Sequence, residues 1–280
     1  MPEYDQWGYD LAKKMYDQAH FEMSVDVIHF QDCIEGMKPL ASQSIDLVIA
    51  DPPFGINFSG KESYYNRDES YVISNYVEID SSDYEDFTHQ WVAHVARLMK
   101  PTASFYFVSG WSHLRDALNA LHASGLTLLN HIIWKYPFGV YSQAKKFVSS
   151  HYHILLAVKD LENYYFNKVD HYPLDVWEIS RNYKKKQPKN GTKLPEDVVD
   201  KMIHYSSKPG DVVLDPFMGN GTTAACAVDL FRHYMGFEIN KELTDLILDN
   251  TQQWKPGGRY PQYLIKPTTQ STLLAGEKKG

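Results

Sequence analysis

The chain lacks several features that would place it in a specialised class. Its 280 residues include two cysteines, Cys33 and Cys226, too few for a disulfide framework or a multi-cysteine metal site. No apolar run approaches the roughly 20 residues of a membrane span, and the polar, acidic N-terminus is unlike a secretory signal. These absences predict a cytoplasmic protein with no membrane association and no bound metal.

A net excess of basic charge is also missing. The formal net charge is −7, with 28 Lys and Arg against 35 Asp and Glu, so the chain is not a uniformly basic DNA-coating protein. Binding to duplex DNA stays compatible with this charge, because a local basic stripe can contact the phosphates. The run Lys184, Lys185 and Lys186 is such a stripe, although a solvated loop is the alternative for so short a run.

What the chain does contain is an alternation of apolar strands and amphipathic helices. Strands are expected at 25–30, 45–50, 103–108, 126–134, 153–158, 212–214 and 234–237, and helices near 33–40 and at 84–99, 114–124 and 194–206. Such alternation predicts an α/β domain with a mostly parallel sheet and helices on both faces. The expected parts are a helical N-terminal extension (1–24), two halves of the main domain (25–158 and 190–255), a small lobe (159–189) and a tail (256–280).

One expected strand leads into a glycine-rich loop, Asp215-Pro216-Phe217-Met218-Gly219-Asn220-Gly221-Thr222-Thr223, the 215–223 loop. Gly219 and Gly221 allow a ligand to approach the backbone, and Thr222 begins a helix whose N–H groups favour a carboxylate or phosphate. Glu238 ends the next strand, where α/β nucleotide sites hold ribose hydroxyls. The loop also satisfies the loose dinucleotide pattern G-x-G-x-x-A, but it lacks the Gly-Lys-Ser/Thr of a P-loop.

Another strand ends in Asp51-Pro52-Pro53-Phe54, the 51–54 loop. The exocyclic amino group of adenine or cytosine is a poor nucleophile, because its lone pair is delocalised into the ring. The Asp51 carboxylate and the Pro52 carbonyl can accept its N–H protons, and Pro53 helps to fix the backbone. Phe54 offers a ring face for a base flipped out of the duplex. Taken alone, the loop could equally be a turn after a strand.

Together the two loops resemble those of the amino-group DNA methyltransferases, which take a methyl group from S-adenosylmethionine. Their order, with the 51–54 loop first, is that of the β class. The resemblance implies a Rossmann-like, S-adenosylmethionine-dependent methyltransferase fold that is circularly permuted and carries a small target-recognition lobe. It implies that the cofactor contacts Asp32, Asp215, Phe217, Gly219, Gly221, Thr222, Thr223, Glu238, Thr192 and Lys193.

One of these assignments has an alternative interpretation, and another falls in a motif that departs from the family pattern. Asp32 matches the family acid that bonds the adenine amino group of the cofactor, but without the family it reads as a helix cap. The family usually has His-x-Thr-x-Lys-Pro where this chain has Asn190-Gly191-Thr192-Lys193-Leu194-Pro195. The family's Lys contact with the cofactor is therefore in doubt here.

The target is less closely defined. An Asp in the first position of the 51–54 loop is commoner in adenine-N6 enzymes, whereas residues 130–140 and 147–157 resemble solitary archaeal CTAG enzymes, some of which are cytosine-N4 methyltransferases. Both bases therefore stay open. Trp134, Tyr136 and Phe138 are expected to wall a pocket for the base or, alternatively, to pack against helices.

The resemblance names double-stranded DNA as the partner, at a short, palindromic site suited to a homodimer. The enzyme is then either solitary or the modifying half of a pair with a separately encoded restriction endonuclease, associated with the nucleoid. An RNA or protein amino-group methyltransferase and an inactive nucleic-acid-binding subunit are the alternatives.

Overall fold

A computed structural model describes residues 7–55, 79–136, 145, 147–180, 194–251 and 253–260. Within them, one sheet has eight strands in the order β1-β8-β7-β2-β3-β5-β4-β6. Its strands are β1 (Val27–His29), β2 (Ile45–Ala50), β3 (Met99–Ser109), β4 (Thr127–Lys135), β5 (His151–Val158), β6 (Val176–Glu178), β7 (Val212–Asp215) and β8 (His233–Phe237). The run from β1 to β3 is parallel, so these strands end at one edge of the sheet, which we call the carboxyl edge.

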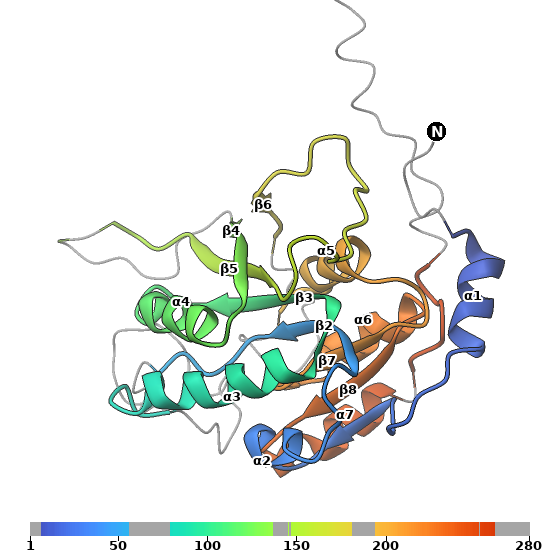
Figure 1. The fold of residues 1–280 in the computed structure, drawn as a ribbon, viewed down its shortest axis with the longest axis horizontal. Coiled ribbons are helices and arrows are strands. Elements are labelled where there is room, and N and C mark those ends of the chain that lie inside the picture. The colour runs from blue at the N-terminus through green and yellow to red at the C-terminus, as the bar shows by residue number, and fades with distance from the viewer. Residues whose placement is uncertain are drawn as a thin grey trace, which may run out of the picture.

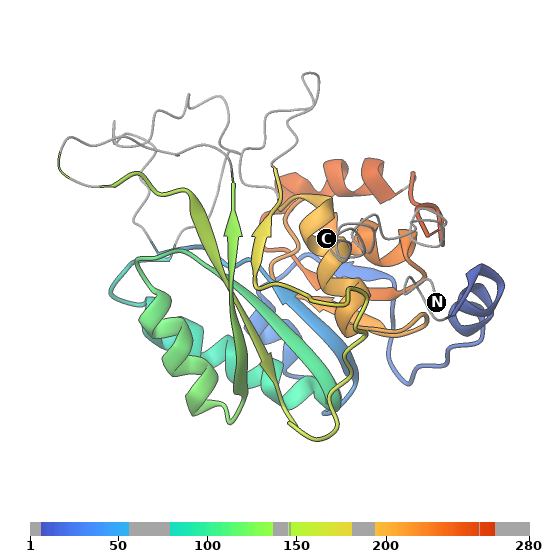
Figure 2. The same ribbon diagram turned by 90° about the horizontal axis from the view of Figure 1, so that it is seen from above.

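Helices cover both faces of the sheet (Figures 1 and 2), as the alternation of elements predicts. The helices are α1 (Tyr9–Asp17), α2 (Cys33–Met37), α3 (Tyr84–Leu98), α4 (Leu114–Ala123), α5 (Glu196–Ser206), α6 (Thr222–Asp229) and α7 (Thr244–Thr251), with the 3-10 turn η2 (Lys241–Leu243) before α7. One core cluster joins the sheet to α2, α3 and α4, and the other joins it to α5 and α6. No helix of the described ranges is long and apolar enough to cross a membrane.

The aromatic side chains of β3 show how one strand serves both cores. Successive side chains of a strand point to opposite faces of the sheet. Phe105 and Phe107 meet the ring of Trp91 in α3, with ring centroids 5.8 and 4.9 Å away. Tyr106 between them lies in the other core, where its hydroxyl is 2.8 Å from Ser206 Oγ in α5. The continuous apolar run of β3 is therefore that of a central strand buried on both faces.

Strand β5 interrupts the parallel pattern, because it runs antiparallel to both β3 and β4. Its reversed direction brings its first residues to the carboxyl edge, beside the ends of β3 and β4. Tyr152 is there paired in register with Trp134. The antiparallel strand thus delivers side chains to the same edge as the parallel strands.

Two segments differ from the sequence-based expectation. The helix α3 stops at Leu98, and β3 begins at Met99 rather than at 103, because Met99 is already paired with Ile45 of β2. Residues 159–189 were expected to form a small lobe outside the main domain. Their described part, up to residue 180, instead contains β6, which is the outermost strand of the main sheet and runs parallel to β4. Trp177 of β6 is buried in the core. The division of the chain into halves and a lobe stays a prediction.

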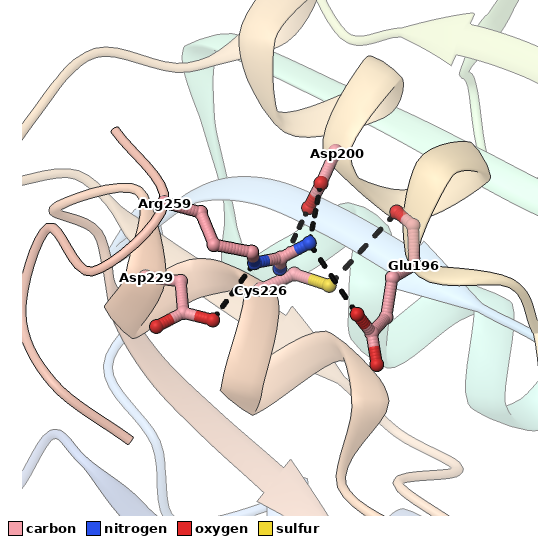
Figure 3. A network of polar contacts seen from close by, with 5 residues as sticks. All are labelled: Glu196, Asp200, Cys226, Asp229 and Arg259. Atoms are coloured by element: carbon pink, nitrogen blue, oxygen red, sulfur yellow. Dashed lines mark hydrogen bonds and ion pairs between the residues drawn. The ribbon is translucent and has the colours of Figure 1, made fainter. Parts of the chain in front are cut away.

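Arg259 joins the segment 253–260 to α5 and α6 by hydrogen bonds and ion pairs (Figure 3). The guanidinium donates to both carboxylate oxygens of Asp200, at 2.7 and 3.0 Å, and to Asp229 at 2.8 Å. Glu196 lies 3.5 Å away, and the buried thiol of Cys226 is beneath the network. Trp254, in the same segment, lies against the start of α6.

Candidate functional site

The 51–54 loop and the 215–223 loop lie side by side at the carboxyl edge. They follow β2 and β7, which are neighbouring parallel strands paired through Leu47 with Val213 and Val48 with Leu214. Glu238 follows β8 on the other side of β7, and Asp32 follows β1 beyond it. The topology therefore gathers the predicted acids at one edge, where open α/β sheets bind ligands.

Asp215 anchors the 215–223 loop from inside. Its side chain is buried, and one carboxylate oxygen accepts the N–H of Phe217 at 2.9 Å. Burial raises the pKa of Asp215 to about 7, and repulsion from Glu238 adds to the rise, while hydrogen bonds from Thr223 and Phe217 oppose it. This acid shapes the loop from within rather than facing a ligand.

Glu238 holds the same loop from the neighbouring strand. Its two oxygens accept the N–H groups of Gly219, at 2.8 Å, and Asn240, at 2.7 Å. Burial raises its pKa, and the backbone N–H groups partly oppose that rise. Each carboxylate oxygen can accept more than one hydrogen bond, so the contacts made within the chain leave acceptor capacity for ligand hydroxyls.

Both loop glycines adopt backbone conformations that other residues rarely take. Gly219 has φ of 53°, and Gly221, the N-cap of α6, has φ of 80°. A Cβ at Gly221 would also lie 3.1 Å from the Trp254 ring. The glycines let the backbone turn tightly so that the first N–H groups of α6 face the carboxyl edge.

Asp32 has the role that its residue type predicts without the family. It is the N-cap of the short helix α2, and its Oδ1 accepts the N–H of Glu35 at 3.0 Å. Its side chain is half-buried at the end of β1. The hydrogen bond from Glu35 uses one carboxylate oxygen of Asp32. A contact between Asp32 and the cofactor stays a prediction.

In the 51–54 loop, Pro52 is buried, and Asp51, Pro53 and Phe54 are half-buried. The Phe54 ring lies 5.7 Å, centroid to centroid, from the ring of Tyr152. A Cβ at Gly110 would lie 3.5 Å from the Phe54 ring. The end of β3 thus packs against the ring that the sequence assigns to the target base.

Tyr152 is a candidate site residue that the sequence reasoning missed. Its ring centroid is 5.4 Å from Trp134 and 5.5 Å from Tyr136, as well as 5.7 Å from Phe54. Trp134 is fully buried and donates its indole N–H to the Ile179 carbonyl at 2.9 Å, so it packs as a core residue. Tyr136 is buried too, which leaves Phe54 and Tyr152 as the more accessible rings of the group.

Several predicted site residues lie outside the described residues: Phe138, Lys184, Lys185, Lys186, Thr192 and Lys193. Leu194, which stands where the family usually has Lys, is described and is buried in the core with Val198. A buried Leu cannot make a polar cofactor contact. The described part of the chain has no group of three or more His, Cys, Asp or Glu that could hold a metal ion.

Comparisons with known proteins agree with this geometry. The family described as DNA methylase, of the N6 and N4 type, matches residues 45–249. The type II methyltransferase M.HinfI of Haemophilus influenzae is 30% identical over 243 residues, covering 80% of this chain and 68% of that protein. M.HpaI of Haemophilus parainfluenzae is 29% identical over 234 residues, covering 77% of this chain and 70% of that protein.

Solved structures of methyltransferases share the fold. The M1.HpyAVI–SAM complex matches with a TM-score of 0.58 and 23% identity, covering 80% of this chain and 98% of that one. The PvuII cytosine-N4-specific DNA methyltransferase matches with a TM-score of 0.62 and 18% identity, covering 82% and 87%. The expected Rossmann-like methyltransferase fold is thereby confirmed.

The carboxyl edge also fits S-adenosylmethionine chemically. The start of α6 presents N–H groups suited to a carboxylate, and Glu238 is an acceptor suited to ribose hydroxyls. The family match spans most of the chain and contains both loops. The chain therefore belongs to the DNA methylase family, the amino-group (N6 and N4) DNA methyltransferases that use S-adenosylmethionine.

Proposed function

We propose that this enzyme methylates the exocyclic amino group of an adenine or cytosine that is flipped out of a short, palindromic site in duplex DNA. The observation that carries the proposal is the pairing of β2 with β7, which sets the 51–54 loop beside the 215–223 loop. A base held at the first loop would meet a methyl donor held at the second. Proximity and alignment of this kind supply much of the acceleration in a displacement reaction.

In this proposal, the 51–54 loop activates and orients the amino group. The Asp51 carboxylate and the Pro52 carbonyl accept its two N–H protons, which turns the nitrogen lone pair out of the ring plane. Phe54, whose ring lies 5.7 Å from that of Tyr152, offers a ring face to the flipped base, and Tyr152 supports the Phe54 ring. When bound, S-adenosylmethionine supplies an electrophilic methyl group. As the nitrogen–carbon bond forms, the methyl–sulfur bond would break with its electrons left on sulfur, and Asp51 accepts the proton that the nitrogen loses.

The 215–223 loop is proposed to hold the cofactor. Glu238 accepts the ribose hydroxyls, and the N–H groups at the start of α6 face the carboxylate. Asp32, Asp215, Phe217, Gly219, Gly221, Thr222 and Thr223 complete the proposed site, with Thr192 and Lys193 contributing from outside the described residues. Asp215 acts here by holding the loop rather than by contact.

The proposed partners extend the same function. Both curated relatives are named type II methyltransferases, which supports a role as the modification enzyme beside a separately encoded restriction endonuclease. A palindromic site would suit a homodimer, with one subunit on each half-site. The PvuII likeness lies below 25% identity, so the choice between cytosine and adenine does not rest on it.

A transfer assay tests the function and settles the base. Unmethylated genomic DNA is incubated with the enzyme and labelled S-adenosylmethionine, then digested to nucleosides and analysed by mass spectrometry. N6-methyladenine or N4-methylcytosine is expected. Asp51→Ala should abolish transfer and leave cofactor affinity nearly unchanged, because Asp51 lies on a different strand end from the 215–223 loop. Absence of any methylated base despite cofactor binding would reject DNA as the substrate of this chain alone.

A further inference from the structure

We propose that His113 is a positioning residue for methyl transfer, which fixes the end of the 51–54 loop through the carbonyl of Gly55. The inference rests on the proposed role of that loop. His113 directly precedes α4, in the connection that follows β3. Its Nε2 lies 3.0 Å from the Gly55 oxygen, and its Nδ1 lies 2.7 Å from Asp116 Oδ2.

The contact is enclosed. The side chains of His113 and Asp116 are 11% and 9% exposed. The Tyr84 ring covers the imidazole, with the ring centroids 4.1 Å apart, and Ser81 Oγ is 3.3 Å from Nε2. A hydrogen bond screened from water in this way constrains the loop more strongly than one made at the surface.

Gly55 is held from a second side as well. Its φ is +63°, and a Cβ at this position would lie 2.4 Å from the Tyr84 ring, so this position requires glycine. Gly55 directly follows Phe54, and Pro52 and Pro53 restrict the backbone before it. Because so few backbone torsions are free between Gly55 and Asp51, a shift of Gly55 would be passed on to Phe54 and the Pro52 carbonyl.

Both ring nitrogens of His113 lie beside oxygen atoms: Nδ1 faces Asp116, and Nε2 faces the Gly55 carbonyl and the Ser81 hydroxyl. Burial disfavours ionisation of Asp116, but hydrogen bonds from His113 and Arg115 outweigh it and lower the pKa of that carboxyl. Asp116 is therefore a carboxylate, and Gly55 offers a carbonyl. A ring N–H at Nδ1 donates to Asp116, and a ring N–H at Nε2 donates to the Gly55 carbonyl. Among the described residues, the polar side chains of Tyr84, Ser81 and Arg115 also lie near the ring or its carboxylate partner.

The test separates positioning from folding by steady-state kinetics and cofactor titration. His113→Ala should lower kcat by roughly tenfold to a hundredfold, as expected for a misplaced catalytic loop, with the Kd for S-adenosylmethionine unchanged. His113→Gln, whose amide can still donate to Gly55, should recover most of kcat. His122→Ala, an exposed histidine on the same helix, is the matched control and should behave as wild type.

A comparison of kcat with the KM for S-adenosylmethionine gives a second readout that a merely structural role would not move. In Asp116→Asn the amide oxygen can still accept a hydrogen bond from Nδ1, so the ring should keep its orientation toward Gly55. This variant should therefore retain most of kcat, whereas His113→Ala should lose kcat with little change in that KM. An unchanged kcat in His113→Ala, or parallel losses of kcat, cofactor affinity and melting temperature in every variant, would overturn the inference. A wild-type enzyme that methylates no DNA would instead reject the proposed function.

Discussion

Replacing Arg259 by Ala should destabilise the fold and disturb the cofactor loop together. Arg259 is the cation at the centre of the network in Figure 3, and it is 20% exposed at its side chain. Its principal partner, Asp200, is 2% exposed and receives two hydrogen bonds from the guanidinium. Removal of Arg259 takes away the cation that this buried carboxylate faces.

The expected loss follows from the burial of Asp200. Removing one partner of a buried ion pair typically costs about 3–5 kcal/mol, because the remaining charge is neither solvated nor paired. For a domain of this size about 1 kcal/mol corresponds to roughly 2–4 °C in melting temperature. The melting temperature should therefore fall by about 10 °C. Arg259 and Trp254 lie in the same segment, 253–260, and the Trp254 ring packs against Gly221 of the 215–223 loop. If the loss of Arg259 releases this segment, Trp254 no longer supports the loop, so the affinity for the cofactor should fall as well.

Chemical denaturation and calorimetric cofactor titration measure both effects. The informative control is the double variant Arg259→Met with Asp200→Leu, which removes both charges and keeps side-chain volume. Replacing both members of a buried pair by apolar residues is often close to neutral, so the double variant should be more stable than Arg259→Ala. Lys255→Ala, an exposed change in the same segment, should leave stability within about 0.5 kcal/mol.

A loss of less than about 1 kcal/mol in Arg259→Ala, the range of an ordinary surface pair, would refute the expected role of Arg259. A double variant as unstable as the single one would refute it too, because the cost would then come from lost packing rather than from the buried Asp200 carboxylate that has lost Arg259.

Gly221→Val should reduce the affinity for S-adenosylmethionine at least tenfold in calorimetry, because valine is strained at a φ of 80° and meets the Trp254 ring; undiminished affinity would refute the proposed cofactor site. Asp215→Asn should change how stability depends on pH. The pKa of Asp215 is raised to about 7 from about 4 in the unfolded chain, so its neutral form favours folding at low pH, and stability declines as pH rises from about 4 to about 7, by up to about 4 kcal/mol. Denaturation across that range should show a smaller decline in Asp215→Asn than in wild type. Replacing Lys184, Lys185 and Lys186 by Ala should weaken DNA binding and flatten its salt dependence, whereas an unchanged slope would show that the run does not contact phosphates.

Most elements were predictable because they are local. The apolar run of β2 and the acid after it, or the helical periodicity of α3, are contained in short stretches of sequence. The boundary at Met99 was not, because pairing with Ile45, far away in sequence, decided it. Local propensity carries no information about such a partner.

The residues of the candidate site also fall into two groups: those in contiguous motifs could be predicted from the sequence, and those placed by long-range contacts could not. The 51–54 and 215–223 loops are recognisable as contiguous phrases that follow strands. Tyr152 was missed because its position depends on the antiparallel direction of β5, which the sequence of β5 does not indicate. The links from His113 to Gly55 and from Arg259 to Asp200 likewise join residues far apart in sequence. Single polar contacts of this kind leave no periodic signal.

The place of β7 in the sheet has a consequence for how the chain reaches its native state. β7 lies between β2 and β8, yet it is synthesised long after β2, as the 166-residue separation between Asp46 and its hydrogen-bond partner Val212 shows. Until β7 leaves the ribosome, one edge of β2 has no native neighbour. Pairings over such sequence distances form slowly, and unpaired strand edges favour aggregation while they persist. The arrangement that brings the two loops together thus makes folding of the nascent chain depend on β7, and on protection of the β2 edge until β7 has been synthesised.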